Sequence, residues 1–142
     1  MQRATRDNLG FLLAKATQRW NELLAERFRE AGYPEVRPSY GSLLVPLFEQ
    51  DGLRMSELAA RARLSKQTMT TMVRLLERDG LVERRPDPGD GRATLVELTA
   101  KARAFRPVAE QALAQLDALV RTALTPTDVR RLKAALKGVT AL

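Results

Sequence analysis

The sequence predicts a mainly helical chain with one small β-hairpin, an α+β class, and three observations support this. Apolar residues recur at helical spacing over long stretches at both ends of the chain. Two short helical patterns lie between them, in residues 55–62 and 65–79. Two strand-like segments, 81–85 and 94–98, come next and enclose a run of turn formers. We therefore expect a winged helix-turn-helix, flanked by long amino- and carboxyl-terminal helices.

The terminal helices begin and end at recognisable signals. The first is expected over about Asn8–Ala31, with Asp7 as its cap and Gly32 as its stop. After the hairpin, Thr99 caps a second long helix, and Thr125-Pro-Thr-Asp begins the last one. These helices carry more apolar surface than a small central domain can cover. We therefore expect two copies of the chain to form a symmetric homodimer through them.

Two short helices are expected before the helix in residues 65–79, and a proline leaves the start of the first one open. This helix is expected in Ser39–Gln50. If it begins at the start of that range, Pro46 clashes with the Ser42 carbonyl and kinks it; if it begins at Ser42, Pro46 lies in the tolerant first turn. The next helix, in residues 55–62, has Ser56 as its expected cap and Glu57 in its first turn.

Composition excludes several classes of function. The chain has 24 Lys and Arg against 17 Asp and Glu, a net charge of +7, which favours a polyanionic partner. It has no cysteine and no histidine, so disulfides, thiolate metal sites and histidine acid–base chemistry are excluded. We expect that the protein is not an enzyme and that it has no catalytic residues, no cofactor and no metal. Because no apolar run approaches the ~20 residues of a membrane span and no signal peptide is evident, we expect a cytoplasmic protein and no membrane partner.

The helix in residues 65–79 has two chemically different faces. Ser65 caps it and Gly80 ends it, while Met69, Met72, Val73 and Leu76 recur at the spacing of a buried stripe. The other face is cationic and rich in hydroxyl and amide groups, which suits phosphates and base edges. The alternative is an ordinary solvated helix face. Lys66, Gln67, Thr70 and Thr71 should reach bases, and Arg74 should reach a phosphate. The full set of candidates for DNA contact on this helix is Ser65, Lys66, Gln67, Thr68, Thr70, Thr71 and Arg74.

An ordered set of local patterns across the middle of the chain resembles the MarR family of dimeric bacterial and archaeal transcription regulators. It comprises Ser56-Glu-Leu-Ala, Ser65-Lys through Leu76-Glu-Arg-Asp-Gly-Leu-Val-Glu-Arg, and Asp87-Pro-Gly-Asp-Gly-Arg-Ala running into Leu98-Thr99. The resemblance implies one domain over 1–142, with the winged helix-turn-helix in 39–98 and dimerisation helices in 1–38 and 99–142. It also implies a sequence-specific regulator of transcription, in particular a homodimeric repressor that binds a pseudo-palindromic operator in double-stranded DNA.

The resemblance assigns roles within the wing, which is the hairpin made of residues 81–85, residues 94–98 and the turn between them. It implies that Asp90 orients the wing and that Arg92 enters the minor groove, where a narrow groove concentrates negative potential. Gly91 stands where relatives commonly carry a second arginine, so Arg84 and Arg85 become more important as phosphate contacts. The alternative for Asp90 and Arg92 is a polar hairpin tip without contact to DNA.

A small aromatic ligand is a further expectation from the resemblance, because effectors of the family often bind between the dimerisation helices and the winged helix. The aromatic candidates for such a pocket are Trp20, Tyr40, Phe48 and Phe105. We favour core packing for these residues, because aromatics at helical spacing usually fill space. For the whole chain the rival interpretation is a basic architectural protein that binds DNA with little sequence preference and no effector.

Overall fold

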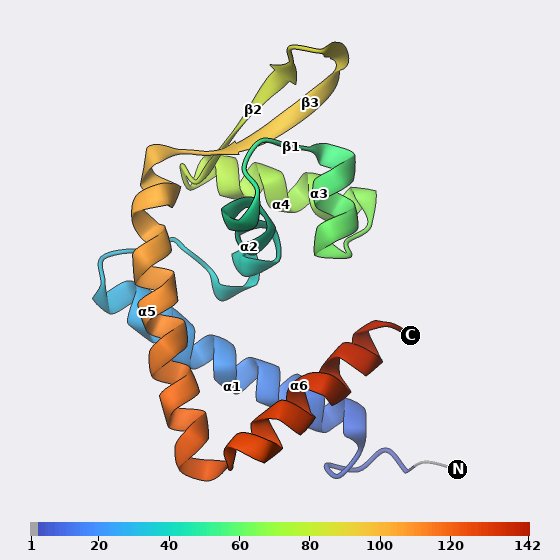
Figure 1. Ribbon diagram of the computed structural model, residues 1–142, viewed down its shortest axis with the longest axis vertical. Helices are drawn as coiled ribbons and strands as arrows, with labels where there is room; N and C mark the ends of the chain where they lie inside the picture. Colours follow the sequence, from blue (N-terminus) through green and yellow to red (C-terminus); the bar gives the residue numbers. More distant parts are fainter. Residues whose placement is uncertain (1–2) are drawn as a thin grey trace.

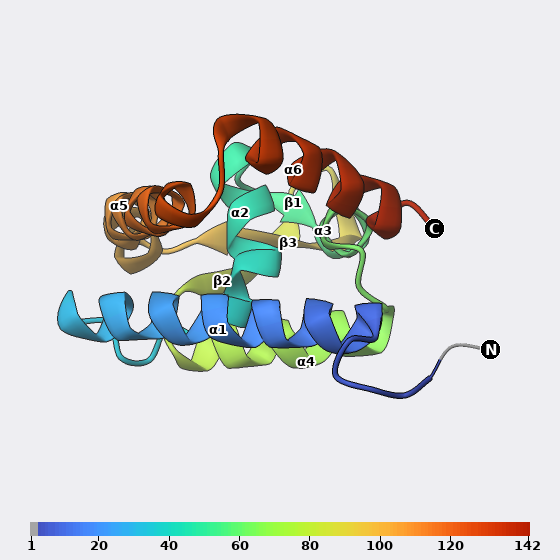
Figure 2. The same ribbon diagram turned by 90° about the horizontal axis from the view of Figure 1, so that it is seen from below.

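The computed structural model describes residues 3–142, which form a mainly helical chain with a small antiparallel sheet (Figure 1), as predicted. The wing projects at one end of the molecule, whereas α1 and α6 lie at the opposite end and α5 connects the two (Figures 1 and 2). In chain order the elements are α1 (Leu9–Glu30), η1 (Pro38–Tyr40), α2 (Gly41–Glu49), β1 (Leu53–Arg54), α3 (Met55–Ala62), α4 (Lys66–Arg78), β2 (Val82–Asp87), β3 (Asp90–Leu98), α5 (Ala100–Ala123) and α6 (Pro126–Thr140).

The ends of the long helices follow the predicted signals with one exception. The cap of α1 is Asn8, whose Oδ1 accepts a hydrogen bond from the Gly10 N–H at 2.9 Å, so the prediction of Asp7 was wrong by one residue. Gly32 stops the helix at a φ of 93°, a conformation that glycine adopts without strain. Thr99 caps α5 as predicted, with its Oγ1 accepting from the Ala102 N–H at 3.1 Å.

The segment around Pro46 takes neither of the two expected forms. A short 3-10 turn, η1, comes first with Pro38 at its start, and α2 then begins at Gly41. Pro46 therefore lies inside α2, beyond the first turn. The 3-10 turn supplies an entry to the helix that sequence periodicity does not distinguish from the helix itself.

The sheet contains one strand that the sequence did not reveal. β1 pairs with β3 through Leu53 opposite Val96, giving the antiparallel order β1-β3-β2. This pairing holds Arg54 in an extended conformation directly before α3, so Arg54 and not Ser56 is the capping residue. Its backbone N–H donates to Glu57 Oε1 at 3.2 Å, which confirms the role predicted for Glu57 in the first turn. β2 and β3 are also longer than expected and leave only a tight turn between them.

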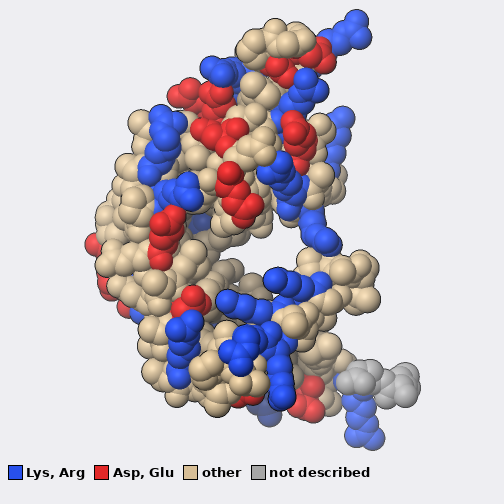
Figure 3. All heavy atoms as spheres, viewed as in Figure 1, with Lys and Arg blue, Asp and Glu red and all other residues tan. Residues whose placement is uncertain are grey.

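The terminal helices leave much apolar surface uncovered. None of the residues of α6 is buried. Space-filling Figure 3 shows a hollow between the half that carries the wing and the half formed by the terminal helices, with Lys and Arg side chains at its lower edge. The large apolar side chains that remain exposed, apart from Val45, belong to α1, α5, α6 and the carboxyl terminus: Leu9, Phe11, Leu12, Leu113, Leu119, Leu132, Leu136, Val139 and Leu142.

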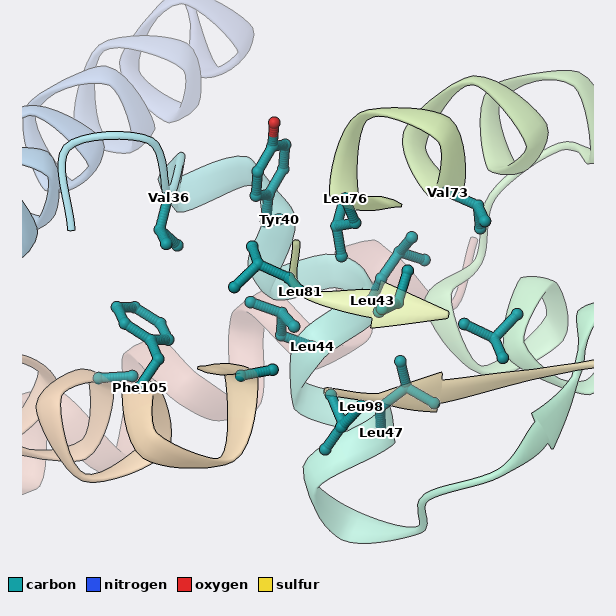
Figure 4. Close-up of a cluster of buried hydrophobic side chains, with 14 of the residues drawn as sticks. Val36, Tyr40, Leu43, Leu44, Leu47, Val73, Leu76, Leu81, Leu98 and Phe105 are labelled. Carbon is teal, nitrogen blue, oxygen red and sulfur yellow. The ribbon is translucent and has the colours of Figure 1, made fainter. Parts of the chain in front are cut away.

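The core lies where α2, α4, the sheet and α5 meet (Figure 4). Its largest fully buried side chains are Tyr40 and Phe105, and the Phe105 ring packs edge-on against Phe28 with centroids 4.9 Å apart. Leu43, Leu76 and other aliphatic side chains fill the space between the helices and the sheet. This core fixes α4 and the wing relative to each other. No helix within residues 3–142 has the length and hydropathy needed to cross a membrane.

Candidate nucleic-acid interface

The turn between α3 and α4 is built from local signals in the sequence. Arg63 adopts a left-handed conformation with φ 54°, and the Leu64 N–H donates back to the Ala59 carbonyl at 3.1 Å. Ser65 then caps α4, its Oγ accepting from the Thr68 N–H at 3.2 Å. Because this turn is tight, α4 leaves it with Met69, Val73 and Leu76 in the core, and its polar face remains outside.

The side chains on the outer face of α4 differ in the hydrogen bonds that they can still make. The Thr70 hydroxyl donates to the Lys66 carbonyl at 2.9 Å, and the Thr71 hydroxyl donates to the Gln67 carbonyl at 3.2 Å. These two hydroxyls are therefore left to act as acceptors. The Gln67 amide is exposed and makes no side-chain hydrogen bond within residues 3–142, so its two donor hydrogens and its acceptor remain available.

An open groove of about 670 Å³ brings α4 together with the wing and the start of α3. Lys66 and Thr70 line its helix side, and Arg84 and Arg92 line its wing side. Arg54, Ser56 and Thr94 complete the wall and were not predicted as site residues; Ser56 had been expected only as a cap. Their participation depends on the pairing of β1 with β3, which no local pattern indicates.

Two of the four cations that line this groove already have acidic partners. Arg84 Nε lies 2.9 Å from Glu77 Oε1, and Arg54 Nε lies 2.8 Å from Asp87 Oδ2. Lys66 and Arg92 make no ion pair within the described part of the chain, and the same is true of Arg74 further along α4. These unpaired cations give the groove a charge that a phosphate backbone can neutralise.

Arg84 and Arg85 point to opposite faces of β2 because successive side chains alternate along a strand. Arg84 lies on the face that continues into the groove. Arg85 lies on the other face, where its Nη2 is 2.6 Å from Glu97 Oε1. The structure therefore brings Arg84 into the same groove as α4, whereas Arg85 is directed away from it.

The turn of the wing aims Arg92 through a bulge in β3. Pro86 pairs with Thr94 and Asp87 pairs with Asp90, so residues 91–93 lie between these pairs without partners on β2. Asp90 Oδ1 accepts a hydrogen bond from the Arg92 backbone N–H at 3.0 Å. The aspartate thus holds the backbone of Arg92, and the guanidinium remains exposed and available. A bulge of this kind redirects a side chain away from the plane of the sheet.

A second aspartate anchors the turn of the wing. Asp87 Oδ1 accepts from the Gly89 N–H at 2.8 Å, while its Oδ2 accepts from Arg54. Two hydrogen bonds hold the pKa of Asp87 below its usual value: the one from the Gly89 N–H has the larger effect, and the one from the Arg54 guanidinium has the smaller effect. Asp87 was seen in the sequence only as part of the wing motif, and its partner lies on a different element.

Comparison with known proteins shows a similarity to one family in the middle of the chain. A family model described as the MarR family matches residues 38–94, from η1 into β3. The HTH-type transcriptional repressor Rv2887 of Mycobacterium tuberculosis is 36% identical over 91 residues, which are 64% of this chain and 66% of that repressor, just under two thirds of its length. Residues 38–94 therefore match the MarR family, and the proteins that the chain resembles over a longer stretch are transcriptional regulators. Its relatives in these comparisons are transcriptional regulators and repressors and not enzymes.

Solved structures resemble this chain over nearly its whole length. A probable transcriptional regulator from Pseudomonas aeruginosa has a TM-score of 0.79 at 27% identity, covering 94% of this chain and 97% of that one. CouR from Rhodococcus jostii RHA1, bound to p-coumaroyl-CoA, has a TM-score of 0.74 at 26% identity, covering 97% and 95%. CouR bound to a 23-mer DNA duplex shares the fold, with a TM-score of 0.74 at 23% identity, covering 99% of this chain and 100% of that one.

Three of the four aromatic residues that were singled out line one cavity. Trp20, Phe48 and Phe105 surround a space of about 200 Å³ between α1, α2 and α5. Tyr40 does not line it: its hydroxyl points away from Phe105 (Figure 4) and donates to Asp79 Oδ2. Asn21 and Arg37 supply polar groups to the wall, which the aromatic pattern could not place. Within residues 3–142 no group of three or more acidic side chains could hold a metal ion.

Proposed function

We propose that this chain is a homodimeric transcriptional repressor of the MarR family that reads a pseudo-palindromic operator in duplex DNA. The observation that supports this most strongly is the groove shared by α4 and the wing. Its unpaired cations, Lys66 and Arg92, lie on the two elements that a winged helix-turn-helix presents to DNA. Lys66 lies at the amino end of α4, the end that reaches base edges in helix-turn-helix complexes.

Residue roles divide between bases and phosphates in this proposal. Gln67 is the main reader, because its free amide can make a bidentate contact with adenine. Thr70 and Thr71 accept hydrogen bonds from base amino groups or contact thymine methyl groups. Ser65 and Thr68 lie at the amino end of α4 beside these positions. Lys66 reaches base edges and Arg92 enters the minor groove. The phosphate contacts are Arg74 and Arg84, with Arg85 as a contact outside the groove.

A second copy of the chain supplies the missing cover for the terminal helices. All side chains of α6 except Val129 are exposed, and Leu132 and Leu136 keep 45% and 40% of their surface accessible. An amphipathic helix of this length is stable in water only when its apolar face is packed against another surface. We therefore assign residues 1–38 and 99–142 to dimerisation and residues 39–98 to DNA binding. A two-fold axis between the copies makes the operator pseudo-palindromic.

The cavity beside Trp20 is the proposed site for a small aromatic effector that releases the operator. Its volume of about 200 Å³ is below the ~300–1,000 Å³ of drug-sized ligand sites, which favours a single-ring aromatic acid. Arg37 makes no ion pair within the described residues and can bind a carboxylate at the rim. Trp20 is the only tryptophan, so its fluorescence reports occupancy directly. Benzoate should quench this fluorescence in the wild-type protein and less in Arg37→Ala.

The test of the proposed function is selection of bound sequences from random duplex DNA. The selected site and a random duplex of the same length are then titrated at one stated salt concentration, because the ratio of affinities is interpretable only at fixed salt. A specific regulator should prefer the selected site by about 1,000-fold or more, and the site should show two related halves. A ratio near one would instead identify an architectural DNA-binding protein.

A further inference from the structure

The carboxyl end of α4 is held by a buried side chain from the segment that precedes α2. Tyr40, the last residue of η1, is only 1% exposed, and its hydroxyl donates to Asp79 Oδ2 at 2.5 Å. Asp79 is the capping residue of α4, and its own N–H donates to the Leu75 carbonyl at 3.0 Å. The hydrogen bond therefore joins two elements that are 39 residues apart in the chain, one of which presents the reading face.

Other contacts hold the same end of α4 by its backbone. Lys101 Nζ donates to the Asp79 carbonyl at 2.8 Å, and the Thr99 hydroxyl donates to the Gly80 carbonyl at 2.6 Å. Lys101 also forms an ion pair with Glu35 at 2.8 Å. These contacts tie the chain after α4 to α5. The Tyr40 hydroxyl is the contact that ties the side chain of Asp79 to η1.

The segment that contains Tyr40 also forms part of the cavity wall. Arg37, Pro38 and Gly41 line the cavity, while Tyr40, between them in sequence, is directed the opposite way toward α4. A shift of this segment therefore reaches the Asp79 side chain directly through one hydrogen bond, whereas the route from Glu35 through Lys101 reaches only the Asp79 carbonyl. No other side-chain hydrogen bond within residues 3–142 joins this segment to α4.

We propose that Tyr40 is a positioning residue for DNA recognition, which acts through Asp79 to set the tilt of α4 and couples the cavity wall to the reading face. This inference rests on the proposed function. At 1.5 Å per residue, Gln67 lies about 18 Å from Asp79 along the helix. A tilt of about 5° at the Asp79 end moves the amino end of α4 by roughly 1.5 Å. This is several times the ~0.5 Å within which the residues of a binding site must be held.

The experiment compares two variants that each remove one tyrosine hydroxyl from the same part of the chain. Tyr40→Phe keeps the buried ring and loses the hydrogen bond to Asp79. Tyr33→Phe is the matched control: the Tyr33 ring packs against Phe105 at 5.0 Å, and its hydroxyl makes no hydrogen bond within residues 3–142. Affinities for the selected operator and for random duplex DNA are measured for both full-length variants, together with their thermal unfolding.

Tyr40→Phe should lower operator affinity about fivefold to twentyfold. The loss of a hydrogen bond to a charged group is the cause, and only part of its energetic effect should reach the DNA-binding face. Its affinity for random DNA should stay within twofold of the wild type, since non-specific binding depends on charge and not on the tilt of α4. Tyr33→Phe should leave both affinities unchanged. A role confined to stability would shift the unfolding temperature without changing the ratio of the two affinities.

A double-mutant cycle keeps the proposal testable if the phenylalanine variant folds poorly. Asp79→Ala leaves the Tyr40 ring in the core and should lower the same affinity ratio, and adding Tyr40→Phe should cause no further loss. The proposal is overturned if the two changes are additive, or if a folded Tyr40→Phe keeps the wild-type ratio. If the wild-type protein itself enriches no DNA sequence, the proposed function fails, and this inference fails with it.

Discussion

Arg54 and Asp87 form an ion pair, with 2.8 Å between Arg54 Nε and Asp87 Oδ2, that joins the residue before α3 to the turn of the wing. The pair holds the wing beside the groove that contains Lys66 and Thr70. The Asp87 side chain is 13% exposed and that of Arg54 is 46% exposed, so only the Asp87 side of the contact is shielded from water. The wing is therefore fixed to the helix-turn-helix at its far end as well as through β1.

Asp87→Ala should reduce the ratio of operator to random-DNA affinity about threefold, because an ion pair of this kind contributes modestly and its loss frees the wing from Arg54. The ratio is the right measure, because removing any carboxylate near DNA strengthens binding to all sequences alike. Glu97→Ala is the matched control, since it removes the same charge from the wing but breaks the Arg85 pair on the outer face. An equal effect of both changes would contradict a positioning role for Asp87.

The homodimer makes a prediction about α6. Replacing Leu132 and Leu136 with aspartate should give monomers in sedimentation velocity at micromolar concentration and abolish operator binding, because charges would be buried in the interface. Val45→Asp is the control, since Val45 is 47% exposed but lies on α2. That variant should remain dimeric. A wild-type sedimentation mass equal to one chain would contradict the dimer.

Local signals were sufficient to predict α4 from the sequence. Ser65 as cap, Gly80 as stop and the spacing of Met69, Val73 and Leu76 all act within the helix itself, and the structure confirms each of them. The two terminal helices were predictable for the same reason. The start of α1 was wrong by one residue, at Asn8, where two adjacent residues can both serve as a cap, and α6 continues past Gly138, its predicted end, to Thr140.

The parts of the site that the sequence did not reveal depend on contacts between distant residues. β1 consists of two residues, too few for a pattern, and yet its pairing with β3 places Arg54 beside Asp87. Tyr40 was grouped with the pocket aromatics because of its ring, but its hydroxyl partner is Asp79. Alternation along a strand separates Arg84 from Arg85 only once the register of the sheet is known.

The contrast between bases and phosphates can be tested with Gln67 and Arg84. Gln67→Ala should cost ~1–3 kcal/mol at the operator and little on random DNA, because a base contact is lost. Arg84→Ala should weaken all sequences alike and make the slope of log affinity against log salt shallower by about 1 per subunit. Arg85→Ala is its neighbouring control and should change the slope less, because Arg85 faces away from the groove. Equal losses on operator and random DNA for Gln67→Ala would contradict its reading role.

At low pH the Asp79 carboxylate should lose its contribution to the free energy of unfolding. The pKa of Asp79 is held below its usual value of 3.8, first by the hydrogen bond from Arg78 and then by that from Tyr40. A carboxylate whose pKa is lower in the folded state than in the unfolded state stabilises the fold at pH values above its unfolded-state pKa. This stabilisation is lost as the pH falls through the folded-state pKa. The difference in unfolding free energy between wild type and Asp79→Asn should therefore be constant from pH 6 to 5 and shrink below pH 4. Chemical denaturation across this range measures it, and a difference independent of pH would contradict the assignment.

The wing provides the last prediction, because each wing turn has Arg92 as its unpaired cation within the described residues. Arg92→Ala should weaken operator binding more than any other single change in the wing. Asp90→Ala should cost less, because the arginine remains and only the hydrogen bond to its backbone N–H is lost. A Cβ added at position 91 would have no heavy atom of another part of the chain within 4 Å, so a side chain can leave the backbone there without a clash.

Gly91→Arg should tighten binding, chiefly to operators with A·T-rich flanks, because a narrow minor groove concentrates the negative potential that attracts arginine. The measurement is a titration of Arg92→Ala, Asp90→Ala and Gly91→Arg against operators that differ only in their flanks. Gly91→Ala is the control that fills the same position without a charge. If Arg92→Ala is indifferent to the flanks and costs less than Arg85→Ala, the wing does not enter the minor groove and its arginine serves only as a phosphate contact.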